Sequence, residues 1–338
     1  MKNRVSVVGA TGYSGAELVS ILAKHPGAEI VSLFSSEASK GALFGSIHPS
    51  LRNSDGPEVR AFTLDALTDS SPETVFLATP NELSAALVPE LVGAGITTID
   101  LSGSYRLRDD SLYPRYYGFD HPAAALLDQA VYGLTEWCNG SLEGARLVAN
   151  PGCYATSILL ALKPLAGLLD GSTVICDSKS GVSGAGKKAD PEYSLNELAG
   201  NFKAYGVAGH RHQPEILSQL GQAETSLTFV PHLLPIPRGI FSTIHVGFAE
   251  AVEPEVIEAA YEEAYQTAPF VHTLAHGDLP ILKNVVGTPH CEIGFQLLEG
   301  GNRAVIVSVI DNLLKGAASQ AVQNFNRVNG LGETEGLS

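Results

Sequence analysis

Long apolar runs are missing from this sequence, and none approaches the ~20 residues that a membrane-spanning helix needs. The charged start at residues 1–4 resembles that of a signal peptide. The apolar stretch that follows ends at Gly9 and is too short for one. We therefore expect a cytoplasmic protein that does not contact a membrane. Internal repeats and low-complexity segments are also absent.

Positive charge is scarce, because 21 lysine and arginine residues face 36 aspartates and glutamates, which gives a formal net charge of −15. Such a surface repels nucleic acids and anionic membranes, so we expect neither as a partner. If the ligands are anions, the few basic residues must be concentrated where those ligands bind.

Cysteine is sparse as well, with Cys138, Cys153, Cys176 and Cys291 far apart in the sequence. None of them forms a Cys-x-x-Cys pair, so neither a zinc knuckle nor a redox motif is indicated, and we expect no metal. A chain of 338 residues does not need disulfides to stabilise its core.

The first part of the chain alternates short apolar runs with helical patterns. Strands are predicted at 4–8, 29–34, 74–78, 97–101 and 146–149, and helices at 13–24 and 82–92. Alternation of this kind, with β-branched strands, is typical of a parallel sheet that has helices on both faces. We predict an N-terminal Rossmann-type α/β domain over 1–152.

The pattern changes after residue 152. Helices are predicted at 153–168 and 254–267, and strands at 173–177, 225–230, 240–249, 291–298 and 304–310. Long strands with few helices predict an α+β domain over 153–311, with a mainly antiparallel sheet, for catalysis and oligomerisation. The last helix, 312–328, is expected to pack on the first domain, and the tail after Gly330 to be frayed.

Three glycines follow the first predicted strand and open the first helix. Their spacing, Gly-x-x-Gly-x-x-Gly, is a variant of the dinucleotide-binding motif, in which a helix N-terminus receives a pyrophosphate. The alternative is a tight strand–helix turn without a ligand. We predict that the cofactor is contacted by Gly9, Thr11, Gly12, Tyr13, Ser14 and Gly15.

The end of the second strand indicates which dinucleotide binds. An NAD site usually has an acidic residue there for the ribose 2′-hydroxyl. This chain has Ser35, Ser36 and Lys40, which suit a 2′-phosphate and favour NADP(H). Glu37 is the residue that would favour NAD if its side chain faced the ribose.

A second glycine-rich run, 181–187, has the spacing of a phosphate-binding P-loop. Lys188 stands where that loop requires a serine or threonine to hold magnesium, so we exclude a kinase or ATPase. The run still offers backbone N–H groups to an anion, and we include Gly181, Ser183 and Gly184 among the predicted cofactor contacts.

Cys153 lies where a predicted strand gives way to a helix. The helix dipole stabilises a thiolate at that position and makes the cysteine nucleophilic. A lone cysteine can instead pack in the core like a small apolar side chain. That alternative suits Cys176, which lies inside an apolar strand.

His210 and His212 form a polar cluster before a predicted helix that starts after Gln213. A histidine can take the thiol proton and return it, so cysteine and histidine make a usable nucleophile–base pair. Two alternatives stay open. His-x-His is also a metal-ligand spacing, and histidines also occur at surfaces and in cores without a catalytic role.

Seven motifs resemble those of the N-acetyl-gamma-glutamyl-phosphate reductases, in that family's order and over almost the whole chain. They are GATGYSGAEL (9–18), DLSGSYRL (100–107), NPGCYAT (150–156), SGVSGAGK (180–187), HRHQPEI (210–216), PHLLPIPRG (231–239) and DNLLKGAASQAVQ (311–323). Aspartate-semialdehyde dehydrogenases share the architecture but differ around the cysteine and histidine. Lys187 stands where the family usually has arginine, so we assign it no bidentate contact.

The resemblance implies that Cys153 attacks an acyl phosphate, releasing inorganic phosphate, and that NADPH reduces the resulting thioester. It implies His212 as the acid/base, with His210 as the fallback. Substrate binding is assigned to Arg106, Asn150, Arg211 and Arg238, and a further cofactor contact to Asn312. A homodimer or homotetramer is expected, joined through the sheet of the second domain.

Three other functions compete with this one. The same chemistry could act on a carrier-bound aminoadipyl phosphate in lysine biosynthesis, although a charge of −15 disfavours docking of an acidic carrier. It could also act on aspartyl phosphate. From a different class, the chain could be a non-catalytic NADP-sensing module, which would have no use for the nucleophile and base.

Overall fold

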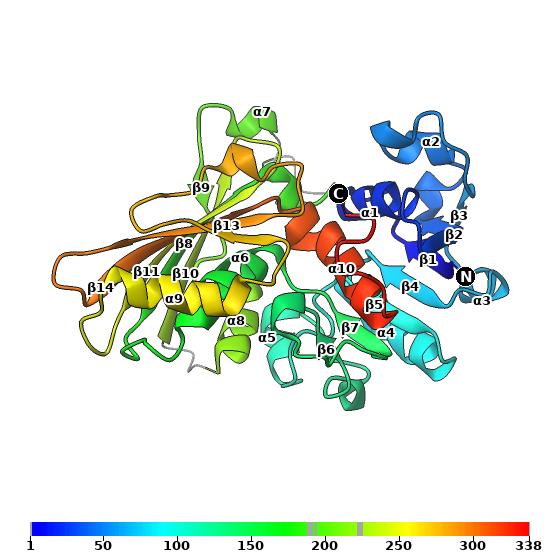
Figure 1. Ribbon diagram of the computed structural model, residues 1–338. Coiled ribbons are helices and arrows are strands. Elements are labelled where there is room, and N and C mark those ends of the chain that lie inside the picture. Colours follow the sequence, from blue (N-terminus) through cyan, green and yellow to red (C-terminus); the bar gives the residue numbers. More distant parts are fainter. Residues whose placement is uncertain (1, 188–191, 193–194, 222–225, 338) are drawn as a thin grey trace. The chain divides into compact units, whose positions relative to one another are not determined.

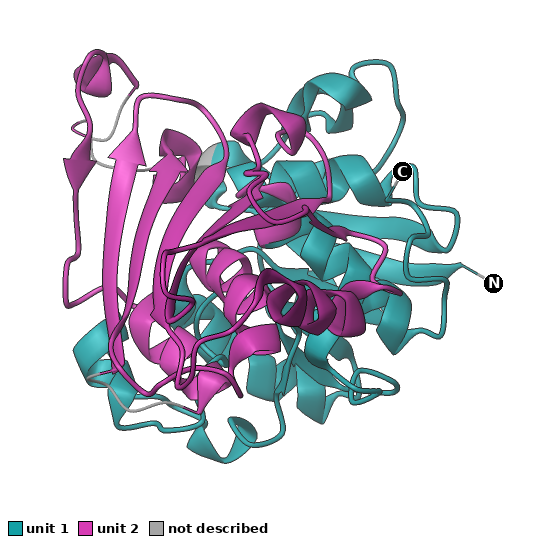
Figure 2. Ribbon diagram, turned by 60° about the vertical axis from the view of Figure 1, so that its left-hand side comes forward, with its two compact units in different colours: residues 1–151, 317–338 teal, residues 152–316 magenta. Residues whose placement is uncertain are grey.

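Two seven-stranded sheets organise the computed structural model, which describes residues 2–187, 192, 195–221 and 226–337 (Figure 1). The chain divides into a first unit, 1–151 with 317–338, and a second unit, 152–316 (Figure 2). Each unit contains one of the sheets. No helix in the described ranges is long and apolar enough to cross a bilayer.

The sheet of the first unit is parallel throughout, with strand order β3-β2-β1-β4-β5-β7-β6. Its strands are β1 (Asn3–Val8), β2 (Ala28–Ser35), β3 (Val59–Ala61), β4 (Thr74–Leu77), β5 (Thr97–Asp100), β6 (Val131–Tyr132) and β7 (Leu147–Ala149). Its helices are α1 (Tyr13–Leu22), α2 (Phe44–Ile47), α3 (Leu64–Asp69), α4 (Asn81–Gly93), α5 (Leu112–Tyr117) and α10 (Ser319–Val328). The predicted Rossmann-type fold is confirmed.

Burial explains why the central strands could be predicted and two edge strands could not. Every residue of β4 is buried, as is typical of parallel strands covered on both faces. Phe34, Val75 and Leu77 belong to one core cluster with the helix residue Leu91. In contrast, β3 has three residues and β6 has two, which is too short for an apolar pattern to show.

The C-terminal segment differs from the prediction in two ways. The predicted helix 312–328 starts only at Ser319, because Leu314–Ala318 forms a π-helical turn. The tail after Gly330 is not frayed: Leu337 is buried, and the Asn326 amide donates to the carbonyls of Glu333 and Glu335 at 3.1 and 2.8 Å. A buried amide that needs acceptors therefore fixes the tail.

The sheet of the second unit is mixed, with strand order β12-β13-β14-β11-β8-β10-β9. Its strands are β8 (Val174–Gly181), β9 (Lys203–Ala204), β10 (Leu227–Leu234), β11 (Ile240–Gly247), β12 (Val271–Thr273), β13 (Cys291–Leu297) and β14 (Arg303–Ile310). The pairs β8–β10 and β12–β13 are parallel, and the other four pairs are antiparallel. The predicted α+β domain with a mainly antiparallel sheet is confirmed.

The helices of the second unit are α6 (Cys153–Leu162), α7 (Leu195–Leu198), α8 (His212–Leu220) and α9 (Pro254–Tyr265). α6 packs on β11 and β14, and nine of its ten residues are buried. The predicted helix 153–168 ends earlier because Pro164 has no N–H to donate, and a short 3₁₀ turn, Lys163–Leu165, follows. The predicted strand 225–230 starts at Leu227 and runs on to Leu234, while residue 225 lies outside the described residues.

Candidate active site

Cys153 is the first residue of α6 and follows the N-cap residue Gly152. The first hydrogen bond within the helix runs from the N–H of Thr156 to the carbonyl of Gly152, at 2.8 Å. The N–H groups of the first turn therefore point along the helix axis toward the cysteine end, where they favour negative charge. Cys153 is half-buried, whereas Cys138, Cys176 and Cys291 are buried, and burial raises the pKa of the Cys176 thiol.

His212 occupies the matching position in α8, of which it is the first residue, and it is buried. The predicted helix start after Gln213 lies too late in the sequence. α6 and α8 are in contact, and the backbone N–H of Gly152 donates to Oε1 of Glu215, in the first turn of α8, at 2.7 Å. Glu215 lies three residues after His212 and so shares its side of the helix. The bond brings together the two helix ends that carry Cys153 and His212.

His210 has a different environment. Its ring lies among those of Tyr154, Tyr205 and Phe229, with centroids 5.7, 5.6 and 5.3 Å away. Its Nδ1 accepts the backbone N–H of His212 at 3.1 Å, which places the proton of the neutral ring on Nε2. Burial, with a smaller contribution from the positive charge of Arg211, lowers the pKa of His210 to about 3. Nδ1 is therefore engaged by the backbone of α8 and does not face a metal, while the fallback role of His210 as acid/base stays a prediction.

A π-helical turn, Leu314–Ala318, packs against Cys153. The N–H of Gly316 donates to the carbonyl of Asp311 at 2.9 Å, five residues back. A Cβ on Gly316 would lie 2.8 Å from Cβ of Cys153, so only glycine fits. π-turns recur at functional sites. Sequence reasoning used this motif only for its resemblance and gave Gly316 no role.

Arg238 is tied to this turn. Its Nε lies 3.0 Å from Oδ2 of the fully buried Asp311, and its Nη2 donates to Oδ1 at 3.1 Å. Asp311 also accepts the N–H groups of Gly287, Leu313 and Leu314, so the carboxylate is well compensated. The predicted contact of Arg238 with substrate stays a prediction, and it would come in addition to this pair.

The glycine-rich run after β8 is held by the segment between β10 and β11. The N–H groups of Gly181, Val182 and Ser183 donate to the carbonyls of residues 239, 236 and 237. For these three groups, the expectation that the run offers its N–H groups to an anion is wrong. Lys187 is exposed, and Lys188 lies outside the described residues.

Asn312 also supports this run. Its Oδ1 accepts the N–H of Gly239 at 2.7 Å, and its Nδ2 donates to Oγ of Ser183 at 3.0 Å. The predicted cofactor contacts of Gly181, Ser183, Gly184 and Asn312 stay predictions.

In the first unit, Arg106 and Asn150 connect the carboxyl ends of strands. Arg106 is buried, and its guanidinium donates to the carbonyls of Asn150 and Leu101, both at 2.8 Å. The Asn150 amide donates to Ala317 at 3.2 Å and accepts from Asn324 at 3.0 Å. Both side chains therefore support the backbone, and their substrate contacts stay predictions.

Arg211, in the second unit, is exposed at the N-cap position of α8.

The three glycines between β1 and α1 differ in what they require. Gly9 has φ +89°, and a Cβ there would lie 2.1 Å from the Ala78 carbonyl oxygen. A Cβ on Gly15 would lie 2.1 Å from the Gly9 oxygen, whereas at Gly12 the nearest atom is 3.4 Å away. Packing alone therefore requires the first and third glycines. The space at Gly12, above the start of α1, fits the approach of a pyrophosphate.

The end of β2 carries the residues predicted to select the dinucleotide. Ser35 is buried and its hydroxyl donates to the carbonyl of Ser36 at 3.1 Å, while Ser36 itself is exposed. Lys40 and Glu37, both exposed, form an ion pair with each other. Glu37 is therefore paired with Lys40 and not with a ribose, and Glu37 partly neutralises the charge of Lys40.

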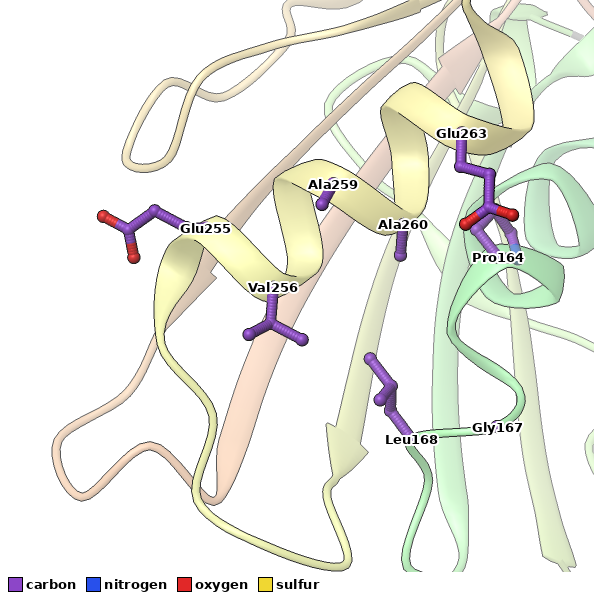
Figure 3. Close-up of a pocket in the computed structure, with 8 residues that line it drawn as sticks. All are labelled: Pro164, Gly167, Leu168, Glu255, Val256, Ala259, Ala260 and Glu263. Atoms are coloured by element: carbon purple, nitrogen blue, oxygen red, sulfur yellow. The ribbon is translucent and has the colours of Figure 1, made fainter.

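A shallow hollow in the second unit is lined by residues of α9 and of the segment that follows α6 (Figure 3). Val256, Ala259 and Ala260 of α9 face Leu168 across it. Leu168 follows the C-terminal end of α6, and Cys153 is at the other end of this helix, a length of ~15 Å at 1.5 Å per residue. The hollow therefore does not belong to the cysteine's surroundings.

Comparison with known proteins shows the family to which the sequence is related. Residues 4–145 match the family described as semialdehyde dehydrogenase, NAD binding domain, and residues 153–312 match semialdehyde dehydrogenase, dimerisation domain. The N-acetyl-gamma-glutamyl-phosphate reductase of Shouchella clausii is 42% identical over 337 residues, which cover 98% of this chain and 97% of that protein. The reductase of the same name from Halorhodospira halophila is 45% identical over 340 residues, with 98% and 97% covered.

Solved structures show the same fold at low sequence identity. Aspartate semialdehyde dehydrogenase II of Vibrio cholerae, complexed with ASA, has a TM-score of 0.71 at 19% identity and covers 97% of this chain and 98% of its own. Aspartate semialdehyde dehydrogenase of Candida albicans, solved with NADP, has a TM-score of 0.65 at 15% identity, with 96% and 98% covered.

Proposed function

Because this chain belongs to the N-acetyl-gamma-glutamyl-phosphate reductase family, we propose that it reduces N-acetyl-gamma-glutamyl phosphate with NADPH. The products are N-acetylglutamate 5-semialdehyde and inorganic phosphate, in arginine biosynthesis. The observation that carries the proposal is the meeting of two helix N-termini, one starting with Cys153 and the other with His212.

In the first step, Sγ of Cys153 attacks the γ-carbonyl carbon while His212 accepts the thiol proton. The S–C bond forms, the C–O bond to the phosphoryl group breaks, and phosphate leaves with that electron pair. The N-terminus of α6 favours both the thiolate and the carbonyl oxygen as it becomes negative. The product of this step is a thioester on Cys153.

The nicotinamide cofactor, when bound, supplies the hydride that reduces the thioester. His212, which holds the proton taken from Cys153, is placed to give it to the tetrahedral oxygen and to take it back as the C=O bond forms. The C–S bond then breaks, the semialdehyde leaves, and Cys153 regains its proton from His212. Among the two histidines we assign this role to His212, because His210 caps α8.

For the cofactor we propose NADP(H). Gly12 and the start of α1 would receive the pyrophosphate, and Ser36 with Lys40 would receive the 2′-phosphate. The 2′-phosphate would compete with Glu37 for Lys40. The ratio of kcat/KM for NADPH over NADH tests the proposal, and a ratio near or below one would contradict it.

We also propose that the protein works as a homodimer or homotetramer in the cytoplasm. The match of 153–312 to a dimerisation domain supports assembly through the second unit. Light scattering coupled to size-exclusion chromatography measures the state in solution, and a monomer at micromolar concentration would contradict it.

The reaction itself is tested in reverse, by phosphate-dependent reduction of NADP with N-acetylglutamate 5-semialdehyde. Aspartate semialdehyde and an aminoadipate semialdehyde serve as competing substrates. We expect kcat/KM to be highest for the N-acetylglutamyl compound, since relatives at 42% and 45% identity carry that name. Absence of any phosphate-dependent reduction would contradict the proposed function.

A further inference from the structure

Glu215, in the first turn of α8, is a fully buried carboxylate. Burying a carboxylate is costly unless hydrogen bonds compensate for the lost water. Its Oε1 accepts the N–H of Gly152 at 2.7 Å, a hydrogen bond between α8 and the N-cap of α6. The Glu215 side chain therefore connects the N-terminal ends of two helices, α8 and α6.

The bond has a defined relation to the two reacting side chains. Gly152 directly precedes Cys153, so fixing its N–H fixes the entry of the chain into α6. Glu215 follows His212 by one helical turn, so its carboxylate and the imidazole lie on the same side of α8. This hydrogen bond, between residues 63 apart in sequence, therefore links the two helix ends that carry the proposed nucleophile and base.

Tyr154 supports the same arrangement from the next position along α6. Its ring packs edge-on against that of His212, with centroids 5.9 Å apart. Burial, with a smaller contribution from Tyr205, raises the pKa of the Tyr154 phenol, so it stays protonated and donates to the carbonyl of His232 at 3.1 Å. The contact of Tyr154 with His212 is made between side chains, whereas Glu215 binds the backbone of Gly152 directly.

We propose that Glu215 is a positioning residue, which holds Cys153 and His212 in reacting geometry by accepting the Gly152 N–H. The inference rests on the proposed function and deepens it. Glu215 acts through the distance between two helix ends and not through its charge. A displacement of ~1 Å between reacting groups can cost about 100-fold in rate.

The test separates the position of the acceptor from its charge. Glu215→Gln keeps an acceptor oxygen at the same reach and removes the charge, whereas Glu215→Asp keeps the charge and withdraws the acceptor by about one carbon–carbon bond. We expect kcat of the Gln variant to stay within about fivefold of wild type. We expect kcat of the Asp variant to fall by about 30- to 100-fold, the range for such a displacement.

KM for NADPH should change by less than about twofold in both variants, because Glu215 bonds to the N-cap of α6 and is not among the residues predicted to contact the cofactor. The melting temperature of each variant shows whether it is folded. Glu255, in the first turn of α9, is exposed, and Glu255→Asp and Glu255→Gln serve as matched controls that should keep wild-type kcat.

The opposite order, with Asp active and Gln impaired, would overturn the inference, because charge would then matter more than position. Equal activity of both variants to wild type would overturn it as well. These outcomes are distinct from failure of the proposed function, in which the wild-type protein itself shows no phosphate-dependent reduction.

Discussion

Two strand-to-helix turns each present the positive N-terminal end of a helix, but the surroundings of the two helix ends differ. The turn from β1 into α1 contains three glycines, and a Cβ added at Gly12 would lie 3.4 Å from the nearest atom, so packing within the protein does not require glycine there. The turn from β7 into α6 starts its helix with Cys153, and protein groups close around it, with Gly316 against its Cβ and Glu215 on Gly152. We propose that the positive helix end receives the cofactor pyrophosphate in the first turn, and that it favours the nucleophilic form of Cys153 in the second.

The largest effect is expected when the proposed nucleophile, Cys153, is replaced. Cys153→Ser should abolish turnover, because a serine alkoxide is far harder to form at neutral pH than a thiolate. NADPH binding should be nearly unchanged, since the α1 turn is intact. Turnover and fluorescence titration with NADPH measure the two effects, and substantial activity of the Ser variant would remove Cys153 from its role.

The next effect concerns the partner of that thiolate. His212→Asn should lower turnover by roughly 10²- to 10⁴-fold, the usual range for loss of a general acid/base. His210→Asn should cost less, because a ring with a pKa of about 3 is neutral and serves as a helix cap. Steady-state kinetics of both variants show which histidine is the acid/base. A larger loss of turnover for His210→Asn would show that the two assignments are reversed.

Two glycines of the α1 turn distinguish packing from ligand approach. Gly15→Ala should destabilise the protein, since its Cβ would lie 2.1 Å from a carbonyl oxygen, and overpacking typically costs about 1–3 kcal/mol. Gly12→Ala should keep the melting temperature and raise KM for NADPH about tenfold, because the methyl group occupies the space of the pyrophosphate. An unchanged KM in the Gly12 variant would contradict the assigned place of the cofactor.

The smallest effect concerns the end of β2. Ser36→Asp adds a negative charge where the 2′-phosphate is proposed to lie, and like charges ~4 Å apart in water repel by about 1 kcal/mol. We expect kcat/KM for NADPH to fall about fivefold and that for NADH to change much less. If both cofactors were affected equally, Ser36 would not face the 2′ position.

The local features of both turns could be predicted from sequence. Glycine spacing after an apolar run, and a cysteine between a strand and a helix, are patterns within a few residues, and the structure places both at helix starts. The alternation of strands and helices likewise indicated the fold class. The π-turn at 314–318 was not visible, because its residues are compatible with an ordinary helix.

What could not be predicted depends on residues far apart in the chain. Glu215 with Gly152, and Arg238 with Asp311, are 63 and 73 residues apart, and a single sequence does not indicate which buried acid meets which donor. The same reason applies to the tail, whose acceptors for Asn326 are carbonyls without any side-chain signature. Resemblance identified the motifs that contain these residues but not their contacts.

Because the four thiols differ in burial, the proposed active sites in a preparation can be counted by a thiol titration. Cys153 is half-buried, whereas the other three cysteines are buried, and Cys138 is hydrogen-bonded to the carbonyls of Tyr132 and Leu134. A thiol reagent added to the folded protein should therefore react quickly with one group per chain, and with four after denaturation. The fast fraction gives the concentration of competent enzyme in a preparation, and the same thiol offers a single attachment point for a reporter group.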